Sequence, residues 1–342
     1  RQMCIRDSPE TDPVISNLVE ETYSPNVTVE SSLYTSTTDY TLVLRANNYS
    51  GGLVTITQNG TEVYTDMPIT RKATSYPVTL DPASETDFTV VYTPSRVDDC
   101  VSYDPVVLRF KVVCKDLAED IEDIYVSPTG SVQTGDGSRE NPIDLESAIG
   151  LSVPGQRIVM LDGTYTIKDK ITIPLTNTGT PIARKYLVAD EGANPVIDLQ
   201  QKTGGFSISG YYWTFEGFTV KNAAGNTKAF EIGGQHIIVD KCTFHDNGDT
   251  GLQISRTDSS DDINDWPAYN LVKNCESYNN NDPSKNNADG FAAKLTSGYG
   301  NIFYRCIGHH NVDDGWDLYT KLASGVIGPV TLEECVAYKP VS

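Results

Sequence analysis

The chain has 342 residues and carries 26 Lys and Arg against 46 Asp and Glu, a formal net charge of −20. A charge this negative argues against nucleic acid and anionic membranes as partners unless cations intervene. No apolar run approaches the roughly 20 residues that a helical membrane span needs. The 27 Gly and 18 Pro indicate many turns between short strands, so we expect an all-β protein.

Residues 1–11 are predicted to be a leader that is not native to the protein. The segment from Arg1 to Ser8 is basic although its surroundings are acidic, and it lacks the apolar stretch of a secretory signal. We therefore expect that any secretory signal has been removed or is not included in this sequence.

Residues 12–115 alternate apolar and polar positions in short runs, which predicts an antiparallel β-sandwich of immunoglobulin or fibronectin type. The clearest runs are 40–45, 53–57, 88–92 and 106–113, and Asn59-Gly60 is typical of a tight hairpin turn. Because no catalytic grouping stands out here, we interpret the region as an accessory domain, either a spacer or a carbohydrate-binding module. Cys100 and Cys114 could form a disulfide within it.

The sequence pattern changes after an acidic linker at 116–123. Residues 124–130 and 142–149 resemble the entry segment of right-handed parallel β-helices, in which a first strand leads to a short helix that covers the open end of the core. We therefore assign 124–342 to a parallel β-helix.

An internal repeat supports this assignment. Similar short motifs end at Phe218, Cys242, Cys275, Cys306 and Cys335, at intervals of 24, 33, 31 and 29 residues, as expected for coils with loops of different length. An apolar residue stands three positions before each of these anchors. Since side chains alternate along a straight strand, we expect a corner or a bulge between the two.

The four anchor cysteines are spaced a whole coil apart, which does not suit a zinc site. We expect them to form an inward column of small apolar side chains, with disulfides between neighbours as the alternative. Asn247, Asn280 and Asn311 each follow an anchor by five residues. They predict a hydrogen-bonded amide ladder along the axis, although Asn is also common where a turn requires its backbone angles.

Two successive coils carry clustered aspartates at the corresponding corner, where a packing role requires no charged residues. Alignment of Gly290 with Gly315 places Asp289 and Asp314 in the same register, with Asp313 and Asp317 close by. Four ionised carboxylates in such a space repel one another, so a cation must neutralise them. Hard oxygen ligands favour Ca²⁺ over Mg²⁺. The alternative is a set of separate turn caps on a solvated face, and His309 and His310 are expected on the coil surface rather than as ligands.

The motifs at 288–295 and 311–319 resemble those of polysaccharide lyase family 9, the pectate and exopolygalacturonate lyases. The resemblance extends over 124–342 and implies that Asp289, Asp313, Asp314 and Asp317 bind calcium. It also implies calcium-dependent β-elimination on an acidic polysaccharide, polygalacturonate. The family's base is a lysine on a later coil. No such motif follows Trp316, so we expect the catalytic lysine and the last coils beyond Ser342.

Three basic residues are hypothesised to contact substrate carboxylates, namely Lys294, Arg305 and Lys321. For Lys294 a structural ion pair or a substrate contact is favoured over the role of base, and for the other two solvated surface is the favoured alternative. Trp316 suits either stacking on a sugar or packing. Two alternative functions remain, a pectin-type glycoside hydrolase on the same fold and a non-catalytic, calcium-stabilised β-helix that binds or adheres. We expect a secreted or cell-surface bacterial protein that is monomeric.

Overall fold

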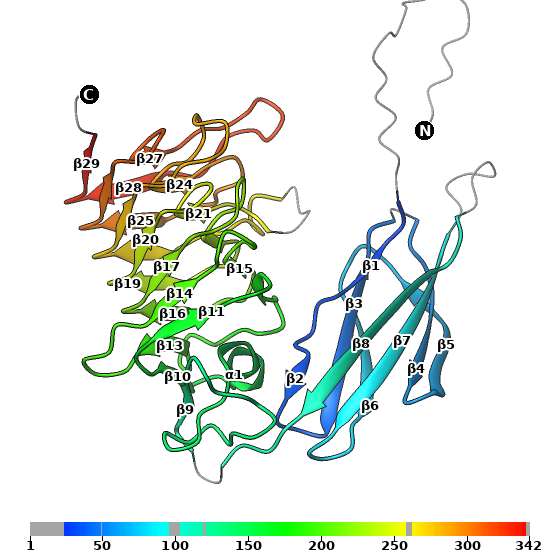
Figure 1. Ribbon diagram of the computed structural model, residues 1–342. Coiled ribbons are helices and arrows are strands. Elements are labelled where there is room, and N and C mark those ends of the chain that lie inside the picture. The colour runs from blue at the N-terminus through cyan, green and yellow to red at the C-terminus, as the bar shows by residue number, and fades with distance from the viewer. Residues whose placement is uncertain (1–23, 49, 96–102, 119–120, 258–261, 340–342) are drawn as a thin grey trace, which may run out of the picture.

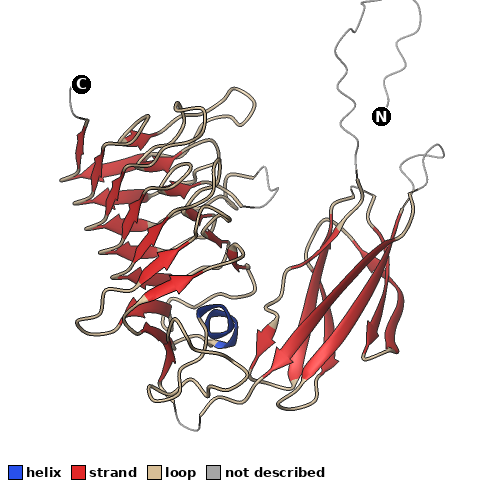
Figure 2. Ribbon diagram, viewed as in Figure 1, coloured by secondary structure: helices blue, strands red, loops and turns tan. Residues whose placement is uncertain are grey.

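The computed structural model describes residues 24–48, 50–95, 103–118, 121–257 and 262–339. It contains two domains, an antiparallel sandwich and a parallel β-helix (Figure 1), as expected from the sequence. In the described residues, regular structure is almost entirely strand, with one short helix (Figure 2). The predicted leader at 1–11 lies outside these residues.

The sandwich consists of two sheets that enclose one apolar core. The three-stranded sheet has the order β1 (Val27–Val29), β3 (Asp39–Ala46) and β6 (Thr74–Thr79). The five-stranded sheet has the order β2 (Tyr34–Thr35), β8 (Val106–Cys114), β7 (Glu85–Pro94), β4 (Gly52–Gln58) and β5 (Thr61–Ile69).

The four predicted runs lie within β3, β4, β7 and β8. The turn between β4 and β5 holds Asn59 and Gly60 at φ of 48° and 80°, as a type I′ hairpin requires. Cys114 is buried with a free thiol. Its suggested partner Cys100 lies outside the described residues.

Three parallel sheets form the β-helix, and each complete coil contributes one strand to each of them, whereas the first described coil contributes only to sheet 1 and the last only to sheets 1 and 2. Sheet 1 contains β9 (Asp123–Val126), β10 (Arg157–Met160), β13 (Lys185–Ala189), β16 (Trp213–Glu216), β19 (Ile238–Asp240), β22 (Leu271–Lys273), β25 (Asn301–Tyr304) and β28 (Val330–Glu333). Sheet 2 contains β11 (Thr164–Thr166), β14 (Val196–Asp198), β17 (Thr219–Lys221), β20 (Thr243–His245), β23 (Glu276–Tyr278), β26 (Ile307–His309) and β29 (Val336–Tyr338). Sheet 3 contains β12 (Ile171–Ile173), β15 (Phe206–Ile208), β18 (Phe230–Ile232), β21 (Leu252–Ile254), β24 (Phe291–Ala293) and β27 (Trp316–Asp317).

Like residues stack on like residues inside the β-helix because neighbouring coils pair in register. Phe206, Phe230, Leu252, Phe291 and Trp316 are consecutive partners along sheet 3. The ring centroids of Phe206 and Phe230 lie 5.0 Å apart, and those of Phe291 and Trp316 lie 5.1 Å apart. Of the two roles considered for Trp316, packing is therefore the one observed.

The expected corner lies immediately before each anchor of the repeat. Lys241, Asn274, Arg305 and Glu334 all have a positive φ of 51–53°. This left-handed residue turns the chain from sheet 1 into sheet 2 and lets both the apolar residue and the anchor face inward. Three of the anchor cysteines are buried and Cys335 is half-buried, all four as free thiols, which matches the predicted column.

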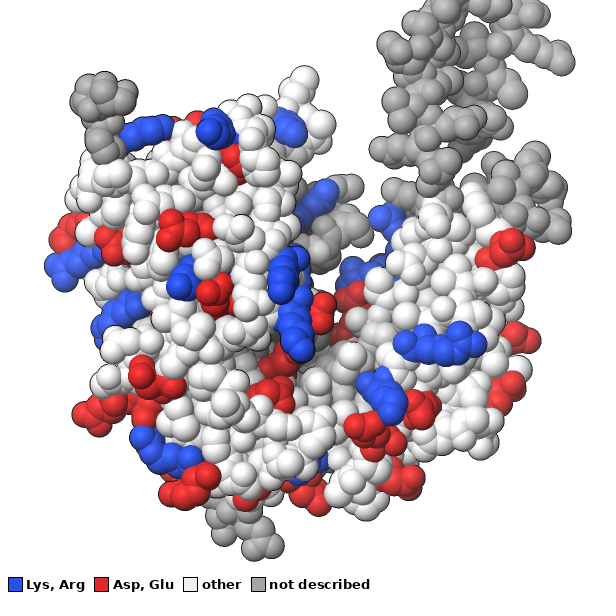
Figure 3. Space-filling view, in the orientation of Figure 1, with Lys and Arg blue, Asp and Glu red and all other residues white. Residues whose placement is uncertain are grey.

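Helix α1 (Leu145–Leu151) covers the first end of the β-helix, as the entry segment predicts. Asp144 caps it by accepting a hydrogen bond from the Ser147 amide at 2.9 Å. Leu145, Ala148 and Ile149 join the β-helix core, and α1 also contacts β2 of the sandwich. Figure 3 shows acidic and basic side chains interspersed over the visible face of both domains.

Candidate metal centre

The aspartates gather at the corner between sheets 2 and 3. Asp289 and Asp314 each stand two residues before a strand, β24 and β27 respectively. The Gly290 amide donates to the Asp314 carbonyl at 2.9 Å, which holds the two coils together. A Cβ on Gly290 would lie 2.7 Å from Asn311 Nδ2 and 2.9 Å from the Gly315 carbonyl. Glycine is therefore required for this close approach.

The predicted amide ladder runs directly beside this corner. Asn247 Nδ2 donates to Asn280 Oδ1, and Asn280 Nδ2 donates to Asn311 Oδ1, both at 2.9 Å. Asn280 also donates to Ser277 Oγ at 3.0 Å, and that hydroxyl donates to the Gly290 carbonyl at 2.7 Å. The ladder thus fixes the backbone from which Asp289 projects.

A buried carboxylate shapes the loop that leads to Asp289. Asp282 Oδ1 accepts hydrogen bonds from the amides of Asn286, Asn287 and Ala288 at 2.9–3.1 Å, and Oδ2 accepts from Ser284. Burial acts to raise the pKa of Asp282, but these hydrogen bonds outweigh it and lower the pKa to about 2. Asp282 is therefore a positioning residue for the next aspartate in the chain.

Asp289 is the buried member of the cluster, with 1% of its surface exposed. Its Oδ2 accepts from Thr250 Oγ1 at 3.1 Å and from Lys294 Nζ at 2.9 Å, and its Oδ1 accepts from the Asp314 amide at 3.3 Å. Burial raises the pKa of Asp289 to about 6, and the negative charge of Asp317 adds to the rise although Lys294 opposes it. The site therefore favours a further positive charge.

Three of the four predicted ligands converge. Asp289, Asp313 and Asp314 each offer a carboxylate oxygen, and these atoms lie within 4.8 Å of one another. Partial burial, Asp314 and Asp317 raise the pKa of Asp313. Such a set of hard oxygen ligands, with excess negative charge, fits a calcium ion and offers no nitrogen or sulfur ligand to a softer metal.

Asp317 forms an ion pair with Lys294 and is not among the three aspartates whose oxygens converge. Its Oδ2 lies 2.8 Å from Lys294 Nζ, and its Oδ1 accepts from the Tyr319 amide at 2.8 Å. Lys294 is 6% exposed. Burial acts to lower the pKa of Lys294, but the two carboxylates outweigh burial and raise it. Of the two roles favoured for Lys294, the ion pair is the contact observed, and the substrate contact stays a prediction.

Arg305 and Lys321, the other two basic residues of the substrate hypothesis, form no ion pair with the cluster in the part of the chain that the structure describes. Arg305 lies at the corner between sheets 1 and 2, where it pairs with Glu334 at 2.5 Å. Lys321 is exposed in a turn after β27. His309 lies outside the trio and on the coil surface, as expected, where its ring is stacked between Tyr278 and Tyr338 at 5.0 and 4.8 Å.

Sequence reasoning missed two residues that position the site, Thr250 and Asp282. A signal for Thr250 was present, because it precedes Gly251 just as Asp289 precedes Gly290 and so occupies the same column one coil earlier. The role of Asp282 depends on a loop that folds back so that the amides of residues 286–288 reach its carboxylate. This loop is not part of the sequence repeat and could not be predicted from it.

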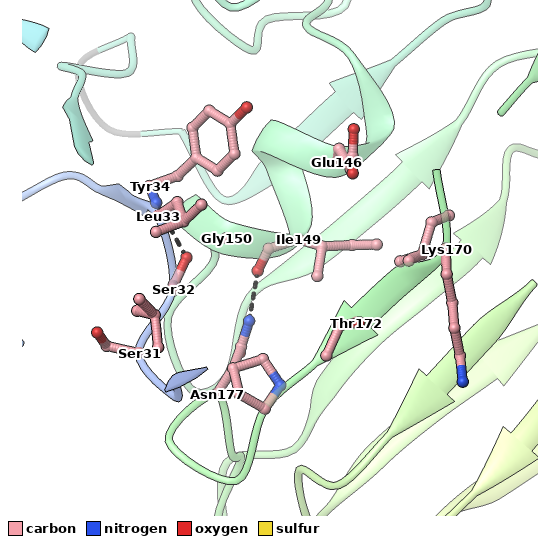
Figure 4. Close-up of a pocket in the computed structure, with 13 residues that line it drawn as sticks. Ser31, Ser32, Leu33, Tyr34, Glu146, Ile149, Gly150, Lys170, Thr172 and Asn177 are labelled. Atoms are coloured by element: carbon pink, nitrogen blue, oxygen red, sulfur yellow. Dashed lines mark hydrogen bonds between the residues drawn. The ribbon is translucent and has the colours of Figure 1, made fainter. Parts of the chain in front are cut away.

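A concavity lies at the junction of the two domains, away from the aspartates (Figure 4). Its volume is about 230 Å³, and Tyr34, Glu146 and Lys170 are among its lining residues. Asn177 Nδ2 donates to the Ile149 carbonyl at 2.8 Å beside it, and Thr176 Oγ1 donates to the Glu30 carbonyl across the junction at 2.6 Å. None of the four aspartates lines this cavity, so it belongs to the domain junction.

Comparison with known protein families adds to this geometry. The model described as "Pel9A-like, right handed beta helix region" matches residues 124–341, well over half of the chain. The model described as "Pectate disaccharide-lyase central Ig-like domain" matches residues 28–112. The right-handed β-helix and the immunoglobulin-like sandwich expected from the sequence are thereby confirmed.

Two curated relatives cover nearly all of the chain. Pectate lyase L of Thermoclostridium stercorarium is 44% identical over 333 residues, which are 97% of this chain and 26% of the relative. Pectate disaccharide-lyase of Dickeya chrysanthemi is 31% identical over 94% of this chain and 40% of the relative. The chain thus spans less than half the length of either protein.

One solved structure agrees with the β-helix assignment. The crystal structure of pectate lyase Pel9A is 30% identical, with a TM-score of 0.54 over 64% of this chain and 55% of that one. The described residues contain no helix with the length and apolar character that a membrane crossing needs.

Proposed function

The chain belongs to the Pel9A-like right-handed β-helix family, and from that membership we propose that it is part of a calcium-dependent lyase that cleaves polygalacturonate by β-elimination. The observation that carries the proposal is the convergence of Asp289, Asp313 and Asp314 from two adjacent coils within 4.8 Å. The relatives named pectate lyase support the same substrate class.

Each aspartate has a distinct part in this proposal. Asp313 and Asp314 are exposed and can exchange water for a cation, whereas Asp289 is buried and fixes the position of the site. Asp317 completes the acidic surroundings from the next strand. Calcium bound there would contact the uronate carboxylate and stabilise the negative charge that develops when the proton at C5 is removed.

No residue of the described site is assigned as the base. A lysine base needs a lowered pKa, whereas the two carboxylates beside Lys294 raise its pKa. Lys294 is also fixed by ion pairs at 2.8 and 2.9 Å. We therefore propose that the base is a lysine outside the described residues, in keeping with the family resemblance.

A glycoside hydrolase is the second candidate, since paired carboxylates also serve hydrolysis. Hydrolytic carboxyl pairs stand about 5–9.5 Å apart to hold the sugar and, in inverting enzymes, a water. The trio here is closer, with ligand atoms within 4.8 Å. The convergence of three carboxylates, where hydrolysis needs a pair, favours a shared cation over an acid and base pair.

The test is an assay of the full-length parent protein on polygalacturonate. We expect products that absorb in the ultraviolet because β-elimination leaves a double bond, and we expect a chelator to abolish them. Reducing sugars without that absorbance would favour a hydrolase. No turnover by the intact parent, with calcium bound, would favour a non-catalytic binding protein.

The location and the role of the sandwich are part of the same proposal. A polymeric uronan is cut outside the cell, so we propose a secreted or cell-surface bacterial protein that acts as a monomer. The sandwich would serve as an accessory domain, either a spacer or a carbohydrate-binding module. Affinity electrophoresis of the whole chain against one lacking residues 1–115 distinguishes these two roles.

A further inference from the structure

Lys294 occupies an unusual place in the carboxylate cluster. It follows β24 directly, and its Nζ lies 2.9 Å from Asp289 Oδ2 on its own coil and 2.8 Å from Asp317 Oδ2 on the next coil. Ala292 projects to the same face of the sheet as Lys294, because side chains alternate along a strand. Ala292 is fully buried.

The hydrogen bonds of Asp289 divide its two oxygens between different partners. Oδ2 accepts from both Lys294 and Thr250, so its acceptor positions are occupied. Oδ1 accepts one long bond of 3.3 Å from the Asp314 amide and is the oxygen left for a cation. Lysine and cation would thus share this carboxylate from different sides.

The charges of the site do not cancel without a cation. Asp289, Asp313, Asp314 and Asp317 contribute four negative charges when ionised, and Lys294 contributes one positive charge. Like charges this close repel strongly in a partly buried site. A lysine held between two of them reduces that repulsion before any cation arrives, and it also opposes the approach of a cation.

We propose that Lys294 is an internal counter-ion that keeps the acidic corner assembled in the metal-free protein and competes with calcium for the same carboxylates. The inference rests on the calcium assignment within the proposed function and is independent of lyase activity. Lys294 acts through Asp289 and Asp317 and is therefore a positioning residue.

The experiment compares K294M with the wild-type chain by calcium titration calorimetry and by thermal unfolding in chelator. K294M removes the charge, so we expect calcium affinity to rise about tenfold or more while the melting temperature in chelator falls. Saturating calcium should restore most of that fall. K294R, which keeps the charge, should resemble wild type in both measurements, and so should the control K321M, which changes an exposed lysine.

Unchanged or weaker calcium binding by K294M, or an unchanged melting temperature in chelator, would overturn the proposal. If K294M does not fold even in calcium, K294Q is measured in its place, because it removes the charge and retains a hydrogen-bonding side chain of similar length. Absence of calcium binding by wild type would overturn both this inference and the metal assignment. Calcium binding without ultraviolet-absorbing products from the parent would count against the lyase function alone.

Discussion

Two corners of the same coils differ in how closely they keep to the repeat. The corner between sheets 1 and 2 has a left-handed residue and then a cysteine in four successive coils, ending at Cys335. The corner between sheets 2 and 3 keeps the Asn ladder but places different residues before its glycines, namely Thr250, Asp289 and Asp314. In a solenoid, a residue type that repeats at the same position of successive coils indicates a packing role. A change of residue type at such a position indicates a candidate functional site.

Asp314→Ala provides the strongest test of this contrast. We expect calcium affinity to fall by about a hundredfold or more, because loss of partners that only orient a metal ligand already costs about 10–100-fold. The melting temperature in chelator should stay close to wild type, because Asp314 is exposed. Titration calorimetry measures the affinity, and Glu334→Gln at the cysteine corner is the control that should leave it unchanged.

Asn280→Ala tests whether the two corners share one scaffold. The variant leaves buried groups of Asn247, Asn311 and Ser277 without their partner. We expect a loss of about 3 kcal/mol or more in the free energy of unfolding, since each of these three buried groups left unsatisfied costs about 1–3 kcal/mol. Urea denaturation measures it. Asn286→Ala, in the exposed part of the nearby loop, should change stability little, and an equal loss in both variants would contradict the ladder's role.

Asp282→Asn tests, through the pH dependence of stability, whether the Asp282 carboxylate holds the loop before Asp289. Because the pKa of Asp282 is lowered to about 2 in the folded protein, its carboxylate stabilises the fold above about pH 4, and this contribution is lost as the pH falls towards 2. At pH 6 the variant should therefore be less stable by about 1–2 kcal/mol. The difference should vanish near pH 2. Denaturant unfolding at several pH values measures it, and a difference independent of pH would contradict the assignment.

Cys275→Ala should have the smallest effect on stability of these variants. It tests whether the corner between sheets 1 and 2 serves packing alone. The thiol is buried in the core, so its removal should cost about 1 kcal/mol. Calcium affinity should be unchanged because the cysteine column lies at the other corner. A loss of calcium binding in this variant would show that the two corners are coupled. Chemical denaturation and calorimetry on the same sample provide both numbers.

The coil plan and the register of the aspartates could be predicted because both are properties of the repeat. Aligning Gly290 with Gly315 was enough to place Asp289 beside Asp314. The direction of the Asp317 side chain could not be predicted, since it depends on the ion pair that this side chain forms with Lys294. In the sandwich, the runs within β3, β4, β7 and β8 were found from their alternation. β2 has only two residues, too few for any periodicity to register.

The position of helix α1 at one end of the β-helix has a consequence for the order in which the coils fold. Because α1 covers the core at the first coil and Gly137 and Ile143 hydrogen-bond to β9 at its outer edge, we expect each new coil to be templated on the coil before it. Synthesis delivers the chain in the same order, from the capped end outward. The cap therefore allows assembly to begin before later coils exist, and it shields an edge on which another polypeptide could otherwise be recruited.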